Sequence, residues 1–314
     1  MSTETQNAER TATQRGFLAR LQASPFLSDL LSNRLAVAGM LIILAMVAIA
    51  LYARFGALVG IAPDLATLKT TQIGTNPSLA PPSAEHPFGT DLQARDIFGR
   101  VLYGAWLAMM FGTVTVSIST TLGVGLGIVA AYYGDITDNV IMRTMDVLLA
   151  FPSLLLALAL VAIFPDELGL WRAVTALTLV YTPRFARVVR GAALKVLEDE
   201  YIDATVALGA KDPRVLVRHV LPNCLAPITV QSTLNFGLAI LDLAALSFLG
   251  FGAEAGTPSW GLILSNGVKQ GLLTGEWWWS FFPGLLLAIT VLGFNLLGDG
   301  MRDALDPRMR EAVD

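Results

Sequence analysis

Residues 35–53 read LAVAGMLIILAMVAIALYA, a run of 19 uncharged and mainly aliphatic side chains. As an α-helix with a rise of 1.5 Å per residue, this run would be about 28 Å long, close to the roughly 30 Å thickness of the hydrocarbon core of a bilayer. The polar residues 1–34 contain no apolar stretch long enough for a signal peptide. The run therefore predicts an uncleaved membrane-spanning helix that follows a cytoplasmic tail.

The composition of the whole chain also indicates a membrane protein. Of its 314 residues, 54% are hydrophobic and 15% are charged, whereas an ordinary soluble domain has about 25% charged residues. The mean hydropathy is +0.61. Further apolar stretches cover residues 101–134, 140–164, 171–189, 222–251 and 278–297. We therefore expect an all-α polytopic membrane protein with six transmembrane helices.

The distribution of basic residues predicts the orientation of these helices. With the N-terminus inside, fifteen Lys and Arg residues fall on cytoplasmic segments and span ends, and six fall outside. Because the loops are shorter than about 60 residues, such an excess sets topology. Both termini should be cytoplasmic, and residues 54–87, with five prolines, should form an external loop. Trp277, Trp278 and Trp279 should then lie at the outer interface.

Residues 190–221 are too polar to span a membrane, and their pattern predicts a structured cytoplasmic loop. Helix formers over 198–208 predict a first short helix, which Gly209 would end in a left-handed cap. Asp212 as the N-cap and Pro213 as the first helical residue predict a second one. The pattern alone also fits an ordinary amphipathic surface loop.

Three polar residues form a stripe in the fifth predicted span. Gln231, Asn235 and Asp242 fall within about 40° of one another on a helix surface, and Asp242 would lie near the outer boundary. We expect this face to point into the protein. It would either line the translocation path or hydrogen-bond neighbouring helices, and the sequence leaves both interpretations open.

Two residue pairs predict contacts within and between the spans. Gly123 and Gly127 have the spacing that lets helices approach closely. Arg143 and Asp146 are three residues apart, which permits an ion pair on one helix face.

Several kinds of site are not expected in this chain. His86 and His219 are predicted to lie on opposite sides of the membrane, which argues against a histidine metal site. No G-x-x-x-x-G-K-[ST] phosphate loop occurs, so the chain should not itself bind ATP in the P-loop manner. No motif combines a nucleophile, a base and an orienting group, and we expect no catalytic residue. We expect no nucleic-acid partner.

The loop resembles a known family motif. Asp203-Ala204-Thr205-x-x-x-Gly209, nine residues, then His219-x-Leu221-Pro222 is similar to the E-A-A-x-x-x-G-x9-I-x-L-P loop of ABC importer permeases, with departures at Asp203, Thr205 and His219. Residues 89–100, 246–250 and 295–308 resemble segments of the dipeptide, oligopeptide and nickel branch, and most closely its dipeptide C-type permease. The usual Arg of that branch is replaced by Trp106.

This resemblance implies a type I importer permease fold in a bacterial inner membrane, with the transmembrane domain over 99–314 and the first helix and external loop over 35–98. The loop would couple the chain to an ATPase, and the candidate coupling residues are Asp203, Ala204, Thr205, Gly209, Asp212 and Arg218. The implied partners are a second homologous permease, two cytoplasmic ATPase subunits that bind ATP and Mg, an external substrate-binding protein and membrane lipid.

The implied cargo is a dipeptide or short oligopeptide. Because the branch also includes nickel and glutathione importers, those cargoes remain alternatives. A secondary transporter or channel would favour ion-relay carboxylates and internal repeats, and neither is evident. A membrane-embedded enzyme would require a polar catalytic cluster at membrane depth.

Overall fold

The structure is a computed structural model of the chain, and it describes residues 25–56 and 76–305. Residues 1–24 of the predicted tail, 57–75 of the predicted external loop and 306–314 lie outside the described residues. Within the described ranges the chain is helical, and an isolated bridge between Thr90 and Asp96 is the one β-type pairing. The all-α prediction is confirmed.

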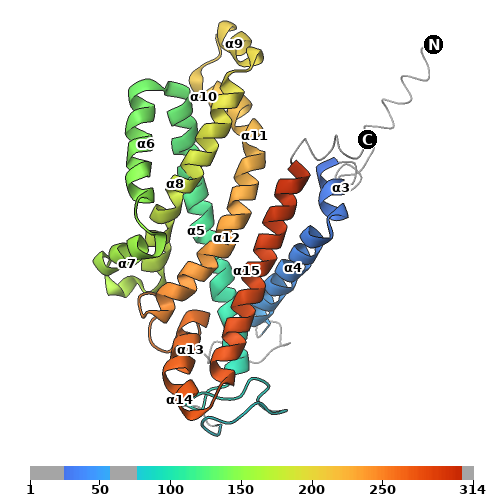
Figure 1. The fold of residues 1–314 in the computed structure, drawn as a ribbon, viewed down its shortest axis with the longest axis vertical. Helices are drawn as coiled ribbons and strands as arrows, with labels where there is room; N and C mark the ends of the chain where they lie inside the picture. Colours follow the sequence, from blue (N-terminus) through green and yellow to red (C-terminus); the bar gives the residue numbers. More distant parts are fainter. Residues whose placement is uncertain (1–24, 57–75, 306–314) are drawn as a thin grey trace, which may run out of the picture.

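The long helices run side by side along one axis of the molecule (Figure 1). They are α4 (Arg34–Phe55), α5 (Ile97–Tyr133), α6 (Asp135–Leu149), α8 (Leu170–Leu197), α12 (Leu225–Phe248) and α15 (Trp278–Leu305). Helix α7 (Ser153–Ile163) lies across this direction, at 95° to α6. The short ones are α3 (Pro25–Ser32), η2 (Asp166–Leu168), α9 (Glu200–Ala207), α10 (Asp212–Val215), η3 (Leu216–Val220), α11 (Leu221–Asn223), α13 (Trp260–Asn266), η4 (Gly267–Gly271) and α14 (Leu272–Thr274). Helix α3 lies within the predicted tail.

Four described helices are long and apolar enough to cross a membrane, namely α4, α5, α12 and α15. Helices α6 and α7 pass the same test as a pair and make a fifth candidate. Helix α8 has 28 residues, but its five basic residues exclude it from that set. The chain is thus multi-pass, while the count of six spans stays a prediction.

The third predicted span, residues 140–164, is not one straight helix. Helices α6 and α7 meet at 95°, and the break falls between Leu149 and Ser153. Pro152 explains the break, because its ring lacks an N–H group and disfavours helical backbone at Phe151. The apolar run continues through the bend, which is why hydropathy alone predicts a continuous helix.

Glycines allow the closest helix contacts in the bundle. A Cβ atom at Gly123 would lie 2.4 Å from the Cβ of Phe185, and one at Gly127 would lie 2.5 Å from the carbonyl oxygen of Ala186. Helices α5 and α8 therefore pack backbone against backbone, which confirms the contact predicted from these two glycines. Helices α4 and α15 meet similarly, since a Cβ at Gly39 would lie 2.6 Å from the backbone nitrogen of Leu297.

The three tryptophans at the start of α15 differ in exposure, and their place at the outer membrane interface stays a prediction. Trp277 is 52% exposed, whereas Trp278 and Trp279 are buried within the chain. The Trp278 ring packs against Gly89, where a Cβ atom would lie 2.6 Å from the indole nitrogen. The Trp278 ring thus joins the loop after residue 76 to the start of α15.

The predicted ion pair between Arg143 and Asp146 is wrong. Asp146 pairs instead with Arg187 of α8. Helix α8 packs against α6, so the long guanidinium side chain reaches the carboxylate from the neighbouring helix.

Candidate functional site

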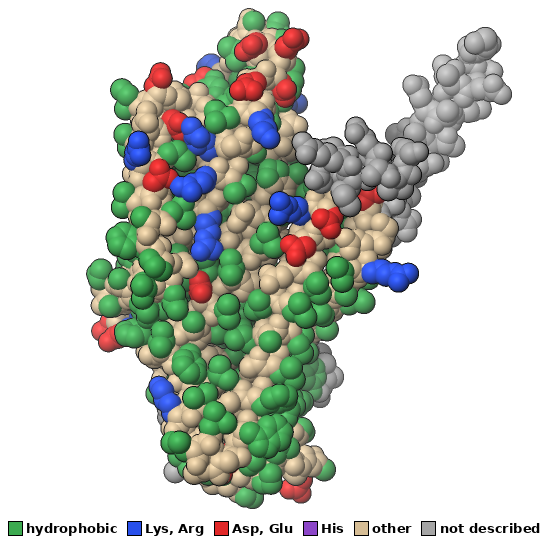
Figure 2. All heavy atoms as spheres, in the orientation of Figure 1, with side chains coloured by type: hydrophobic (Ala, Val, Ile, Leu, Met, Phe, Trp, Pro, Cys, Tyr) green, Lys and Arg blue, Asp and Glu red, His purple; other side chains and the backbone are tan. Residues whose placement is uncertain are grey.

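Residues 190–221, the coupling loop, lie at one end of the bundle. Helix α8 runs eight residues beyond the predicted end of its span and carries the loop outward. Helices α9 and α10 stand at this end, with α9 projecting beyond α6 and α8 (Figure 1). Acidic and basic side chains gather over this end, whereas hydrophobic side chains cover most of the opposite half (Figure 2). The loop thus belongs to the polar end of the molecule.

Helix α9 buries one side chain and presents the others outward. Ile202 is 3% exposed and packs in the bundle core. Asp203 and Ala204 are exposed, and Thr205 is half-buried with its hydroxyl donating to the Tyr201 carbonyl at 2.7 Å. The candidate coupling residues of α9 therefore form an accessible surface.

An exposed leucine marks the tip of this surface. Leu208 follows α9 directly and is 89% exposed. Tyr201 and Val206 of α9 are also exposed, at 42% and 46%, and grouped apolar side chains on a projecting surface are typical of a contact with another protein. The sequence did not identify Leu208 as a contact residue. Its spacing of seven residues from Tyr201 places both on one face of a helix, but it does not show whether that face is buried or exposed.

The turn after α9 has the predicted left-handed backbone at Gly209. Its φ is +83°, and its N–H group donates to the Val206 carbonyl at 2.9 Å. The N–H of Ala210 donates to the Thr205 carbonyl at 3.3 Å. These bonds satisfy carbonyls at the end of α9 and fix the direction in which the chain leaves it.

Asp212 does not cap the second loop helix. Lys211 is the N-cap residue, and Asp212 is the first residue of α10. Its carboxylate accepts hydrogen bonds from the hydroxyl groups of Tyr132 at 3.0 Å and Tyr133 at 3.2 Å. These two tyrosines are the last residues of α5. Asp212 therefore connects the second loop helix to the end of α5, and its side chain does not cap the helix to which it belongs.

Further buried contacts hold the coupling loop against the bundle. Val215 and Val220 are fully buried and share a core cluster with Ile128 of α5 and Val189 of α8. A second tie joins the two halves of the loop. The Asn223 amide donates to the Tyr201 hydroxyl at 3.0 Å.

The remaining loop residues differ in exposure. Partial burial and the Asp199 charge raise the pKa of the exposed Tyr201 hydroxyl above its ordinary value. Arg218 lies in the π-helical segment η3 and is exposed. Asp203, Ala204 and Arg218 thus present accessible side chains, while Asp212 faces the chain itself.

The polar stripe of α12 divides into three different environments. Asn235 is 1% exposed, and neither atom of its amide has a hydrogen-bond partner. Asp242 is half-buried and accepts a hydrogen bond from the Tyr181 hydroxyl of α8 at 2.6 Å. Gln231 is half-buried. Asn235 therefore points into the bundle, and Asp242 points toward α8. Both orientations agree with the inward face predicted from the sequence.

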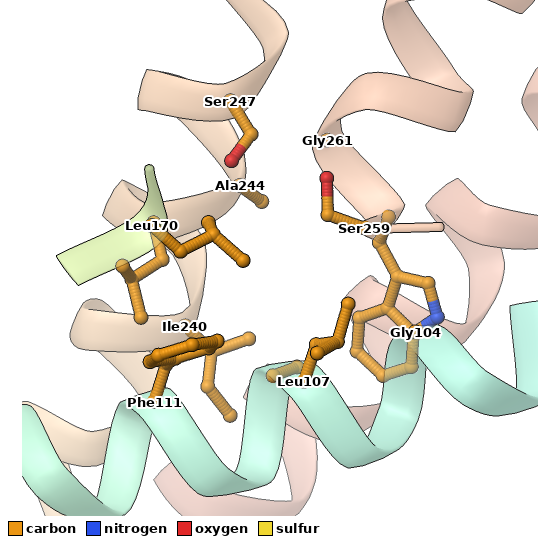
Figure 3. Close-up of a pocket in the computed structure, with 12 residues that line it drawn as sticks. Gly104, Leu107, Phe111, Leu170, Ile240, Ala244, Ser247, Ser259 and Gly261 are labelled. Carbon is orange, nitrogen blue, oxygen red and sulfur yellow. The ribbon is translucent and has the colours of Figure 1, made fainter. Parts of the chain in front are cut away.

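A small cavity lies between α5, α12 and α13 (Figure 3). Its volume is about 30 Å³, and its mainly apolar wall includes the hydroxyl groups of Ser247 and Ser259. A site for a drug-sized ligand has about 300 Å³ or more, so this cavity cannot hold a peptide. A larger groove of about 490 Å³ lies between α5 and the segment from η3 to α12, and it is open and apolar.

Comparison with known proteins identifies the family. The model of the family described as binding-protein-dependent transport system inner membrane component matches residues 123–311. The chain belongs to this family. The match includes the coupling loop, the stripe of α12 and helix α15. Members of this family are membrane components of ABC importers, which hydrolyse ATP on other subunits of the complex, and they are not enzymes themselves.

Relatives of this inner membrane component are similar over most of their length. The dipeptide transport system permease protein DppC of Alkalihalophilus pseudofirmus is 45% identical over 284 residues, which cover 90% of this chain and 88% of the relative. DppC of Escherichia coli strain K12 is 42% identical over 285 residues, covering 89% and 91%. The di/tripeptide transport system permease protein DppC of Pseudomonas aeruginosa is 39% identical over 287 residues, covering 90% of each.

Solved structures support the fold. Two inward-facing crystal forms of the MetNI methionine ABC transporter match with TM-scores of 0.54 and 0.53 at 18% and 20% identity. They cover 66% and 67% of this chain and 97% and 98% of the matched chains. The arrangement of helices is thus that of an ABC importer permease.

Proposed function

We propose that this chain is a permease subunit of an ATP-driven importer that carries dipeptides or short oligopeptides across a bacterial inner membrane. The similarity to DppC proteins, at 39–45% identity along about nine-tenths of the chain, carries this proposal. A projecting loop with a fixed turn and exposed coupling residues fits the transmission of force from a partner. The cargo is a peptide in this proposal, and nickel or glutathione is the alternative.

The coupling loop would dock on a cytoplasmic ATPase subunit. Asp203, Ala204 and Leu208 offer a charge, a small surface and an apolar tip to that partner. Thr205 and Gly209 set the shape of the turn, and Arg218 adds a basic contact. Asp212 would act within the chain, by fixing the loop to α5. ATP and Mg would bind to the ATPase subunits, whose closure the loop passes to the bundle.

A second homologous permease would complete the translocation path. The groove between α5 and α12 is large enough for a peptide, but it is open along one side and apolar. A polar solute needs a path shielded from lipid, and a second bundle can supply the missing wall. An external binding protein would deliver the peptide, and two ATPase subunits would serve the two permeases.

Uptake by the reconstituted complex tests the cargo. We expect the chain, purified with its partner subunits in proteoliposomes, to accumulate labelled L-alanyl-L-alanine in the presence of ATP and the binding protein. Excess glutathione or Ni²⁺ should not compete, whereas excess unlabelled dipeptide should. Uptake of Ni²⁺ or glutathione without uptake of dipeptide would show that the cargo is not a peptide. Dipeptide uptake without the ATPase subunits would show that the importer is not driven by ATP.

Cysteine labelling tests the orientation. Glu85 and Lys211 are exposed and lie on loops at opposite ends of the bundle. In intact spheroplasts, a membrane-impermeant maleimide should label Glu85→Cys, and it should label Lys211→Cys only after lysis. The parent chain is the control, because its Cys224 is fully buried. The reverse labelling pattern would place the coupling loop outside and refute the proposed topology.

A further inference from the structure

Two opposite charges lie on the neighbouring helices α8 and α12, in the parts of these helices that the predicted fourth and fifth spans would place in the membrane. Tyr181 of α8 connects them: its hydroxyl donates to Asp242 at 2.6 Å, and its ring lies 5.0 Å from the guanidinium carbon of Arg184. Tyr181 itself is fully buried, whereas Arg184 and Asp242 are half-buried. The cluster thus has a rigid apolar base and two charged groups that are accessible at the surface of the chain.

The cluster lies at membrane depth. Tyr181 is eleven residues from the start of α8, or about 16 Å at 1.5 Å per residue. Asp242 is six residues from the end of α12, or about 9 Å. Arg184 has no ion pair within 4 Å among the interactions of the described residues. A charge in contact with lipid costs about 2.5 to 3.5 kcal/mol or more at the centre of a bilayer, the depth expected near Tyr181, and less toward the boundary, where Asp242 is expected. The face that carries these groups is therefore turned toward protein or a water-filled path.

The two charges suit the ends of an unblocked peptide. Such a peptide carries a carboxylate and an ammonium group, and a guanidinium binds a carboxylate through paired hydrogen bonds. Asp242 offers a carboxylate for the ammonium group. The other polar groups near this face of α12 continue toward the coupling loop, since Asn235 is two turns away on the same side and has an amide without a partner.

We propose that Arg184 and Asp242, braced by Tyr181, form a binding site in the translocation path for the carboxylate and ammonium groups of a zwitterionic peptide. This inference rests on the proposed peptide-importer function. The site would hold any short peptide by its ends, whatever its side chains. It would also give the peptide an attractive position at a depth where a charged solute is otherwise disfavoured.

Transport by variants tests the site. In the reconstituted complex, Arg184→Gln and Asp242→Asn should each lower L-alanyl-L-alanine uptake at least tenfold, while the ATPase subunits stay bound. The Tyr181→Phe variant separates binding from structure, because it removes the hydroxyl group that joins α8 to Asp242 and keeps both charges. We expect this variant to keep uptake within a few-fold of wild type. A loss of uptake with Tyr181→Phe as large as with Asp242→Asn would show that Asp242 acts as a clasp between α8 and α12, and would overturn the proposal.

Cysteine protection gives an independent measurement. The Asp242→Cys variant should react with a membrane-impermeant cationic thiosulfonate in at least one nucleotide state, and L-alanyl-L-alanine with the binding protein should slow that reaction. Leu292→Cys on the apolar, exposed face of α15 is the control and should not react. If the Asp242→Cys variant reacts in none of the nucleotide states, the proposal is overturned. If the wild-type complex takes up no dipeptide, the proposed function fails first, whereas normal uptake by all variants removes this site alone.

Discussion

Replacing Gly209 by valine is expected to reduce substrate-stimulated ATP hydrolysis and peptide uptake by roughly 5- to 150-fold. Gly209 has a φ of +83°, and nothing lies within 4 Å of a Cβ atom built there. The penalty is therefore backbone strain and not a clash, of order 1–3 kcal/mol for a β-branched residue. At about 1.4 kcal/mol for each factor of ten, this strain shifts the loop away from its docking geometry by the stated factor.

The strain has few ways to relax around the turn. Asp212 is held by the hydroxyl groups of Tyr132 and Tyr133, and Ile202 is buried on the other side of the turn. Both ends of the turn are thus fixed to the bundle. The change in backbone direction must fall on residues between them, which include the exposed tip at Leu208.

The matched control for this variant is Gly209→Asn. Asparagine tolerates the left-handed conformation better than other residues with a Cβ atom, so hydrolysis and uptake should stay within a few-fold of wild type. Both variants should insert and accumulate normally, because Gly209 is exposed at the turn and makes no contact with the apolar bundle. ATPase retention, stimulated hydrolysis and uptake should be measured in parallel. Equal behaviour of the valine and asparagine variants would remove the left-handed turn from the coupling mechanism.

The sequence predicted the long helices because membrane thickness fixes their length. The predicted first span, 35–53, and the observed α4, Arg34–Phe55, differ by one or two residues at each end. The bend between α6 and α7 could not be predicted in this way, because this prediction depends only on the length of an apolar run. Apolarity continues on both sides of Pro152, and hydropathy carries no information about direction.

The contacts of the charged residues could not be predicted from local spacing. Asp146 is three residues from Arg143 but pairs with Arg187, which is 41 residues away along the chain. Asp212 had a local role available as an N-cap, yet its partners on α5 are 79 and 80 residues away. In each case a long side chain on a packed neighbour reaches the carboxylate, and only the tertiary arrangement shows this.

The candidate sites were predictable to different extents. The coupling loop was recognisable because its glycine, its acidic residue and their spacing are local features. Tyr181 and Arg184 were missed, since nothing in the sequence places them beside Asp242, which is 61 residues from Tyr181. The stripe of α12 predicted the contribution of Asp242 to the cluster. The contributions of Tyr181 and Arg184 became visible only from the packing of α8 against α12.

Alanine substitutions at Gly123 and Gly127 are expected to destabilise the protein by forcing α5 away from α8. At Gly123 the added Cβ would lie 2.4 Å from the Phe185 Cβ and 2.7 Å from the Thr182 carbonyl oxygen. At Gly127 it would lie 2.5 Å from the Ala186 carbonyl oxygen. The obstacles are largely backbone atoms, which cannot rotate away, so α5 and α8 must separate.

Overpacking of this kind costs about 1 to 3 kcal/mol per site. For domains of about 150 to 250 residues, each kcal/mol lowers the melting temperature by about 2 to 4 °C. Each single variant should thus melt about 2 to 12 °C below wild type in the same detergent. The double variant should lose less than the sum of the two, because a first separation of the helices makes room for the second methyl group.

Gly125 provides the internal control on the same helix. It lies between the other two glycines, but nothing is within 4 Å of a Cβ atom built there. Alanine is the better helix former by about 1 kcal/mol, so Gly125→Ala should melt at or slightly above the wild-type temperature. Equal melting temperatures for the alanine variants at 123, 125 and 127 would show that α5 and α8 do not pack through their backbones. A loss confined to 123 and 127 would locate the contact on that one face of α5.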